Sequence, residues 1–490
     1  MTMKSKTATR ETQRTQQSQQ NEDKLGRFES LGVALADWSQ RWFPDAFVFA
    51  LLALIVVFLA GMLAGSRVRD LIDYFGQGFW SLIPFTMQMA MIIIGGYVVA
   101  VSPPVSRIIQ RLSRIPRTPR HAIAFTALFS MLVSLISWGM GIIFAALLAR
   151  QIVRHVRGID YRAIAAAAYL GQGTVWALGL SSSAALLMAS PGAIPPALIA
   201  ISGVIPLRQT IYLWQSMVIA IVLICSGVLV AYLSAPAHSV KTAEWFGVHE
   251  PETVRPLEQV EPAAERVEPA TKGEWLENLP LLSLVVGVLG FIYLARLLAA
   301  RGPLAVLDLN TYNFFFLMAG LLLHWRPRSF TQAVSNAVPA TSGVLIQFPF
   351  YGGIFGIVTM SPIAAGMARF FVHVSSRASF PLLVSIYSAV LGMFVPSGGS
   401  KWVIEAPYVL QAAKDLHVHL GWVVQVYNAS EALPNLINPF WMLPILGILK
   451  LRARDLVGFT ALQCMVNVVL VLFLVWTLAR TLAYLPPLLP

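Results

Sequence analysis

Long apolar runs separated by short polar segments constrain this chain more than any other feature of its sequence. Residues 46–64, 79–101 and 212–233 carry no charged side chain, and each run has about the 20 residues that an α-helix needs to cross a bilayer. Only 12% of the 490 residues are charged, against about 25% in ordinary soluble domains. Because lipid cannot satisfy backbone polar groups, repeated runs of this kind predict an all-α polytopic membrane protein.

Arginines gather at the ends of the apolar runs and not on one polar face. The net charge of +12 is therefore interpreted as a topology signal, and no nucleic-acid partner is expected. The densest basic segment outside the N-terminal tail, residues 107–120, follows the second apolar run. The positive-inside rule places this segment in the cytoplasm. Since two crossings precede it, the N-terminus is expected to be cytoplasmic as well.

Two hydrophilic segments divide the chain. The N-terminal tail is rich in Gln, Thr, Ser, Lys and Arg, and a central segment contains nine glutamates with scattered prolines. The predicted organisation is a disordered cytoplasmic tail (1–24), a first transmembrane half (25–233), an acidic cytoplasmic linker (234–278), a connecting span (279–300) and a second transmembrane half (301–490).

A helix-breaking segment predicts a hairpin in each half. Residues 122–149 have arginines at both ends, so both ends carry the cytoplasmic signature, which a single crossing cannot produce. A re-entrant hairpin with its tip at residues 137–139 (Ser-Trp-Gly) does produce it. In the second half, residues 396–400 (Pro-Ser-Gly-Gly-Ser) interrupt the run of residues 380–413, which is the second predicted hairpin.

The two halves resemble one another at a fixed spacing. Adding 259 to the numbering carries Gln88 to Gln347, and the break at residues 138–139 to residues 397–398. The basic pair that follows residues 305–323 belongs in the cytoplasm, whereas the equivalent loop of the first half, Ser66 to Gly78, belongs outside. The sequence therefore predicts an inverted repeat, an arrangement that many transporters use.

Each half also contains a crossing helix that is interrupted by small and polar residues. These broken helices cover residues 163–189 and 422–449. The complete prediction is an all-α polytopic membrane protein with an inverted repeat, about nine transmembrane crossings, two re-entrant hairpins and broken helices.

A helix broken inside the membrane exposes N–H groups at one new end and C=O groups at the other, and can hold an anion and a cation without full charges. Hydroxyl, amide and glycine residues at the breaks suit such sites, although small polar residues also serve as helix-packing devices. The predicted substrate-binding residues are Ser137, Gly139, Ser181, Ser182, Ser397, Gly398, Gly399, Ser400, Asn435 and Asn438. The predicted cation-coupling residues are Thr174, Asn428, Ser430 and Glu431.

Charged residues inside the apolar runs are rarer and more informative. Glu431 stands alone in the second broken helix and could coordinate Na⁺, carry a proton or bond a backbone donor. Lys401 and Glu405 are four residues apart, which on a helix predicts an ion pair. Lys401 could instead snorkel to the interface or attract the carboxylate of a substrate.

Motifs for catalysis or nucleotide binding do not occur in the sequence. There is no H-E-x-x-H, Walker A, G-x-S-x-G or dinucleotide fingerprint, so neither an enzyme nor an ATP-driven pump is expected. The two cysteines, Cys225 and Cys464, form no disulfide framework, and His417 with His419 suits a loop better than a metal site. We expect no cofactor and no metal site, with Na⁺ or H⁺ as the coupling ion.

Several motifs resemble the bacterial short-chain fatty acid transporter family. They include residues 395–399 (Val-Pro-Ser-Gly-Gly), residues 438–444 (Asn-Pro-Phe-Trp-Met-Leu-Pro) and residues 137–141 (Ser-Trp-Gly-Met-Gly). The chain departs from the family pattern at Ser400 and Lys401, where the family tends to have a third glycine and an uncharged residue. Glu431 also stands where an aspartate of a Gly-Asp-Ala-Trp-like run is expected.

The resemblance implies a cation-coupled secondary transporter for short monocarboxylates such as acetoacetate and butyrate. It also implies a multi-pass location in a bacterial inner membrane, with the lipid bilayer and a small carboxylate as partners and a homodimer as one oligomeric option. Two alternatives remain: a carrier of the same fold for dicarboxylates or other organic anions, and a membrane protein that does not transport. A dicarboxylate would need a second anion-binding feature, for which Lys401 is the one hint.

Overall fold

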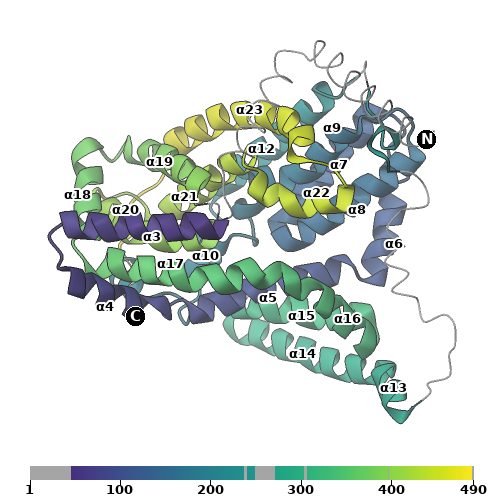
Figure 1. The fold of residues 1–490 in the computed structure, drawn as a ribbon, viewed down its shortest axis with the longest axis horizontal. Helices are drawn as coiled ribbons and strands as arrows, with labels where there is room; N and C mark the ends of the chain where they lie inside the picture. Colours follow the sequence, from purple (N-terminus) through teal and green to yellow (C-terminus); the bar gives the residue numbers. More distant parts are fainter. Residues whose placement is uncertain (1–45, 237–239, 249–270, 303–305, 396, 488–490) are drawn as a thin grey trace, which may run out of the picture.

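The computed structural model is helical throughout the part of the chain that it describes (Figure 1). The predicted tail, residues 1–24, lies outside that part, as does most of the predicted acidic linker. The connecting span and both transmembrane halves lie largely within it. The described stretches are residues 46–236, 240–248, 271–302, 306–395 and 397–487.

The first half is a succession of long helices connected by shorter ones. Its broken helix passes from α-helix into one turn of π-helix and then one turn of 3₁₀-helix. The elements are α3 (Ala46–Leu63), α4 (Val68–Phe79), α5 (Ile83–Ala100), α6 (Pro103–Leu112), α7 (Pro119–Ile136), α8 (Trp138–His155), α9 (Tyr161–Leu170), η1 (Gly171–Val175), η2 (Trp176–Leu178), α10 (Ser183–Met188), α11 (Pro196–Ser202), η3 (Leu207–Gln209) and α12 (Trp214–Leu233).

Short elements of the linker precede the second half, which again alternates long and short helices at its start. The linker contributes η4 (Glu244–Phe246) and α13 (Lys272–Glu277), and the connecting span is α14 (Pro280–Arg301). The second half consists of α15 (Leu309–His324), α16 (Pro327–Ala337), η6 (Val338–Thr341), α17 (Ser342–Met360), α18 (Ile363–Val374), α19 (Phe380–Phe394), α20 (Gly398–Asp415), α21 (Leu420–Asn435), η7 (Pro439–Met442), α22 (Leu443–Leu449) and α23 (Ala453–Ala479).

Equivalent helices of the two halves begin at the predicted spacing. Helix α4 starts at residue 68 and α16 at residue 327, and α5 starts at residue 83 and α17 at residue 342, so both pairs are 259 residues apart. Their contacts are also exchanged between halves: α17 packs against α3 and α4, while α5 packs against α15 and α16. This exchange is what a two-fold repeat would produce, and the opposite orientation of the halves in the membrane stays a prediction.

Several helices in the described part of the chain are long enough to span a membrane. Seven helices or continuous helical runs are long and apolar enough to cross a membrane, and shorter apolar helices accompany them. Two of these helices, α5 and α12, lie in the predicted spans at residues 79–101 and 212–233. The predicted span at residues 46–64 forms helix α3, which counts among the shorter apolar helices. The number of crossings depends on how the hairpins and the short helices sit in the bilayer, and the predicted nine stay a prediction.

Two features differ from the prediction. The segment 66–78, expected to be an external loop, is mostly helix α4, and short helices α6, α16 and α18 also follow long ones. These short helices mix polar and apolar residues, so a search for long apolar runs does not detect them. The first hairpin also extends past its predicted bounds of 122–149, because α7 begins at Pro119 and α8 continues to His155.

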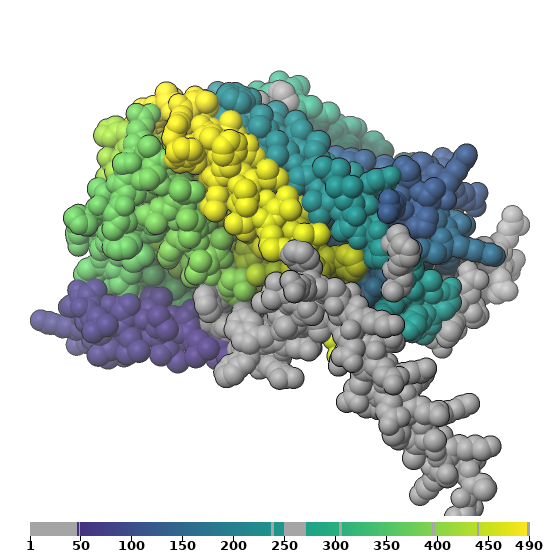
Figure 2. Space-filling model, turned by 90° about the horizontal axis from the view of Figure 1, so that it is seen from above, coloured from purple at the N-terminus to yellow at the C-terminus, as the bar shows by residue number. Residues whose placement is uncertain are grey.

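The two broken helices form the centre of the fold. Every residue of α9 and of α21 is buried, and so is every residue of η1 and η2. Helices α12 and α23 pack against each other, and Figure 2 shows α23 crossing one face of the molecule between the helices of the second half and those of the first. The centre is thus the place where both halves contribute buried polar residues.

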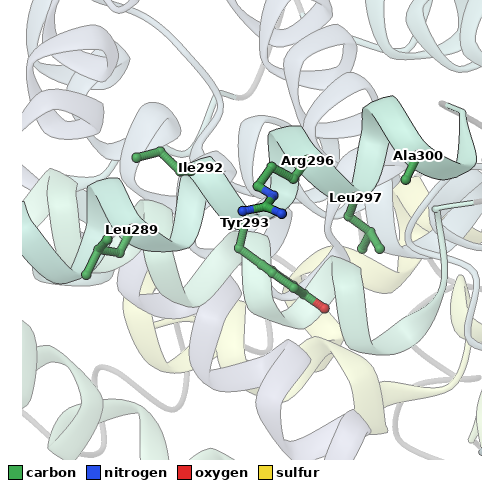
Figure 3. Close-up of a pocket in the computed structure, with 6 residues that line it drawn as sticks. All are labelled: Leu289, Ile292, Tyr293, Arg296, Leu297 and Ala300. Carbon is green, nitrogen blue, oxygen red and sulfur yellow. The ribbon is translucent and has the colours of Figure 1, made fainter.

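Helix α14, in contrast, is mostly exposed. It packs beside α15 and α16 at one edge of the molecule (Figure 1), and most of its large apolar side chains are exposed. A hollow of about 440 Å³ runs along it, and its six lining residues, including Tyr293 and Arg296, all come from this one helix (Figure 3). An exposed apolar helix of membrane-spanning length suits contact with lipid, and this hollow is not the candidate site.

Candidate functional site

The tip of the first hairpin (α7 and α8) lies at Ser137. This residue is extended, with φ −152° and ψ 117°, so the helix stops and restarts in the opposite direction. The N–H of Trp138 donates to Ser181 Oγ at 2.5 Å, and the hydroxyl of Tyr312 donates to the carbonyl of Ile136 at 2.8 Å. The structure therefore brings two predicted residues, Ser137 and Ser181, to one place.

Glycines allow this tip to approach its neighbours closely. A Cβ at Gly96 of α5 would lie 2.8 Å from both Met140 N and Ser137 Oγ, so α5 packs directly on the restarted helix. Gly139 faces the backbone of Ile92 in the same helix. The N-terminus of α8 is thus embedded in protein, as irregular backbone in a membrane must be.

The tip of the second hairpin (α19 and α20) lies at Ser397. It is extended as well, with φ −151° and ψ 102°, and its hydroxyl accepts a hydrogen bond from Ser400 Oγ at 2.5 Å. The hydroxyl of Tyr427 donates to the carbonyl of Gly398 at 2.7 Å. A Cβ at Gly399 would lie 2.9 Å from the ring of Phe85, so this tip has close neighbours in the first half.

Trp176, in η2, is the residue at which the two tips meet. Trp138 of the first tip packs against the cluster of Trp176, Ala177 and Ala432. At the second tip, a Cβ on Gly398 would lie 2.7 Å from Cζ2 of Trp176. Both hairpin tips therefore reach the cluster that contains Trp176.

The other predicted substrate residues lie in or beside the broken helices. Ser182 is buried and caps α10 by accepting from Ala185 N at 3.1 Å, and Asn438 donates to the carbonyl of Met393 at 3.3 Å. Asn435 is buried, and neither its Oδ1 nor its Nδ2 has a hydrogen-bond partner among the described residues. A buried amide without partners is costly, which marks Asn435 as a group available to a ligand or a water.

Three of the four predicted cation-coupling residues have hydrogen-bond partners of their own. The hydroxyl of Thr174 donates to its own helix at Leu170 O, 2.5 Å away, and Asn428 donates to Gln425 Oε1 at 2.7 Å. Ser430 pairs with Ser385 of α19 at 2.6 Å. These contacts satisfy the groups locally, as in the packing alternative considered above.

Glu431, the fourth, forms an ion pair with Lys401. Lys401 is fully buried, and its Nζ also donates to the carbonyl of Ser388 at 2.6 Å and lies 4.7 Å from the ring centre of Tyr427. The predicted pairing of Lys401 with Glu405 is wrong, and Lys401 does not snorkel to an interface. Glu405 instead accepts a hydrogen bond from the hydroxyl of Ser388.

Three residues that contact the polar and charged side chains of this region were not predicted from the sequence: Ser385, Ser388 and Tyr427. Ser385 and Ser388 belong to an apolar run that reads as an ordinary membrane helix, and Tyr427 lies one turn before Glu431. The spacing of Ser385 and Ser388 was the available signal, because residues three apart share one helix face.

A model of the family described as short chain fatty acid transporter matches residues 27–479. Two curated relatives, from Escherichia coli (strain K12) and Haemophilus influenzae, each carry the name "Putative short-chain fatty acid transporter". The first is 34% identical over 422 residues, covering 86% of this chain and 92% of the relative. The second is 33% identical over 425 residues, covering 86% and 93%.

A solved structure shares the fold. The crystal structure of the YdaH transporter of Alcanivorax borkumensis, described as having an unusual topology, superposes with a TM-score of 0.57 at 13% sequence identity. The match covers 89% of this chain and 98% of that chain. With a family match over nearly the whole described chain and an all-helical transporter fold, the protein belongs to the short-chain fatty acid transporter family.

Proposed function

We propose that this protein is a secondary active carrier that moves short monocarboxylates, such as acetoacetate and butyrate, across a bacterial inner membrane together with Na⁺ or H⁺. Family membership supports the substrate class. The observation that carries the proposal is the meeting of both hairpin tips at Trp176. The substrate would bind at this point, between the two halves of the fold.

The tips suit a small carboxylate because two long helices, α8 and α20, begin there. N–H groups at a helix N-terminus attract an anion without the desolvation cost of a buried cation. At the second tip, the hydroxyls of Ser397 and Ser400 lie beside the first N–H groups of α20 and can donate to a carboxylate. On this proposal, Ser137, Gly139 and Ser181 serve the same purpose at the first tip.

The apolar end of the substrate would contact the aromatic residues between the tips. Trp138 and Trp441 form an edge-to-face pair with ring centres 5.6 Å apart, and Trp176 is buried beside them. A substrate of about four carbons has few CH₂ groups to bury, and each contributes about 0.8 kcal/mol to the free energy of binding. Contact with these aromatic rings would therefore be enough to hold it. Rocking of the hairpins would expose the site to each side in turn, as in other transporters built from repeats.

The dicarboxylate alternative loses its one structural hint. A second carboxylate would need a second anion-binding group, and Lys401 is already engaged by Glu431 and by the carbonyl of Ser388. Freeing Lys401 for a substrate would leave a buried carboxylate unpaired, which costs about 3–5 kcal/mol. The arrangement therefore favours a monocarboxylate.

Uptake of radiolabelled acetoacetate and butyrate into proteoliposomes tests the proposal. Counterflow is the cleanest form: labelled substrate outside exchanges for unlabelled substrate inside, without any ion gradient. We expect exchange that exceeds that of protein-free liposomes and that is competed by unlabelled butyrate but not by succinate. Absence of exchange with both monocarboxylates, together with clear exchange of succinate or citrate, would contradict the assignment.

A further inference from the structure

A cluster of three buried charged residues lies directly behind the second hairpin tip. Lys401 and Glu405 belong to α20, Glu431 belongs to α21, and each has an exposed fraction of 0%. Helix α19 closes the cluster, since a Cβ at Gly392 would lie 3.3 Å from both Lys401 Nζ and Glu431 Oε2. We call Lys401, Glu405 and Glu431 the buried charge cluster.

The charges of the cluster do not balance. It contains one ammonium group and two carboxylates, and the ammonium pairs with Glu431. Glu405 receives only the hydroxyl of Ser388, and its Oε2 has no hydrogen-bond partner among the described residues. An unpaired carboxylate in a dry interior is strongly unfavourable, so the closed cluster requires one further positive charge.

The surrounding helices supply no second cation within the described chain. The titratable groups nearest the cluster are tyrosines: Tyr387 of α19 and Tyr408 of α20, whose hydroxyls lie 2.9 Å apart, and Tyr427 of α21. Helices α10, α11 and α17 also pack on α20 and carry no charged side chain. Helix α18 keeps Arg369 and His373 on its exposed side. The missing charge must therefore come from solution.

We propose that the missing charge is a proton, that Glu405 binds it, and that H⁺ and not Na⁺ is the coupling ion of this carrier. The inference rests on the proposed function and specifies its coupling ion. A Na⁺ ion would need several oxygen ligands, but Lys401 Nζ already pairs with Glu431 Oε2 and with the carbonyl of Ser388. Of the carboxylate oxygens in the cluster, Glu431 Oε1 and Glu405 Oε2 remain without a hydrogen-bond partner among the described residues, which is fewer ligands than Na⁺ needs. The chain's own ammonium group fills the position that a monovalent cation would take.

The proton is linked to the substrate through the second hairpin tip. Lys401 lies in the first turn of α20, and a Cβ at Gly398 would lie 3.6 Å from Glu431 Cγ. A carboxylate bound at this tip adds a negative charge next to the cluster, which makes a second unpaired carboxylate there less favourable. Substrate binding therefore favours proton binding at Glu405, and the reverse holds by linkage.

The transport step balances in atoms and charge. With the site open to one side, hydronium gives its proton to a carboxylate oxygen of Glu405, forming an O–H bond and leaving water. After reorientation, that O–H bond breaks and the proton passes to water on the other side, while the substrate anion also leaves. One proton and one monocarboxylate cross together, so the cycle moves no net charge.

The full-length chain in proteoliposomes tests this inference, with initial rates of labelled acetoacetate uptake corrected for protein-free liposomes. An inward proton gradient in Na⁺-free buffer should accelerate uptake, entrapped pyranine should report the protons that enter with it, and a Na⁺ gradient at equal pH should have no effect. Uptake that responds to Na⁺ and not to the proton gradient would overturn the inference, even without any variant.

Two carboxylate variants localise the proton. Glu405→Gln should lose the acceleration of uptake by the proton gradient, while gel filtration still shows folded protein. Asp415→Asn, an exposed carboxylate at the end of the same helix, should behave as the wild type. Glu405→Gln that keeps the full response to the proton gradient would overturn the assignment to Glu405. If the wild type shows no counterflow, the proposed function itself fails, and this inference fails with it.

Discussion

Replacing Lys401 with methionine removes the ammonium group of the buried ion pair and keeps most of the volume of the side chain. The structure gives this ammonium three contacts: the carboxylate of Glu431, the carbonyl of Ser388 at 2.6 Å and the ring of Tyr427 at 4.7 Å. Removing one partner of a buried ion pair costs about 3–5 kcal/mol, because the other charge is left uncompensated. We therefore expect Lys401→Met to lower the free energy of unfolding by about that amount.

The paired variant separates this mechanism from a simple loss of packing. Lys401→Met combined with Glu431→Gln removes both charges, and we expect it to cost only about 1–2 kcal/mol, the value of the hydrogen bonds lost. The difference is a coupling energy that a double-mutant cycle measures. SDS-induced unfolding of the purified protein, followed by tryptophan fluorescence, is the assay, with Lys414→Met near the end of the same helix as control. A double variant less stable than Lys401→Met alone would refute the reasoning.

Three further substitutions concern the second hairpin tip and the broken helix beside it. Gly398→Ala places a methyl group 2.7 Å from Cζ2 of Trp176, and overpacking of this kind costs about 1–3 kcal/mol. Counterflow should therefore fall sharply, whereas Gly366→Ala in α18, where the site is open, should leave it at the wild-type rate. Ser397→Ala removes a hydroxyl donor to the carboxylate, worth about 1.5–3 kcal/mol, and should weaken substrate affinity about 10- to 100-fold. Asn435→Ala should abolish uptake while gel filtration still shows folded protein; wild-type rates in both Ser397→Ala and Asn435→Ala would remove the proposed pocket.

Features that depend on local sequence were accessible to prediction. The spans follow from apolar runs whose length matches the bilayer, and the break at Ser397 follows from Pro, Ser and two glycines in succession. The spacing of 259 also reappears in the helix boundaries, because the order of long and short helices repeats with it. Short helices such as α4 and α16 were missed, because their polar faces hide them from a search for apolar runs.

The sequence did not predict which residues pair with the buried charges. Lys401 and Glu405 satisfy the helical i,i+4 rule, yet tertiary packing places Glu431 of the next helix closer to the ammonium. Likewise, the contact of Gly398 with Trp176 joins residues of different halves, which no local pattern reveals. The sequence located the polar residues at the helix breaks, whereas the pairing among them depends on how α19, α20 and α21 pack together.

Protection of cysteines by substrate tests most directly the claim that both hairpin tips line one carboxylate site. In a chain whose Cys225 and Cys464 are replaced by serine, Ser137→Cys, Ser397→Cys and the control Gly366→Cys would be introduced singly and labelled with a maleimide in proteoliposomes. We predict that butyrate slows labelling at both tips and leaves the control unchanged. Unchanged labelling at both tips, or protection at one tip only, would contradict the account.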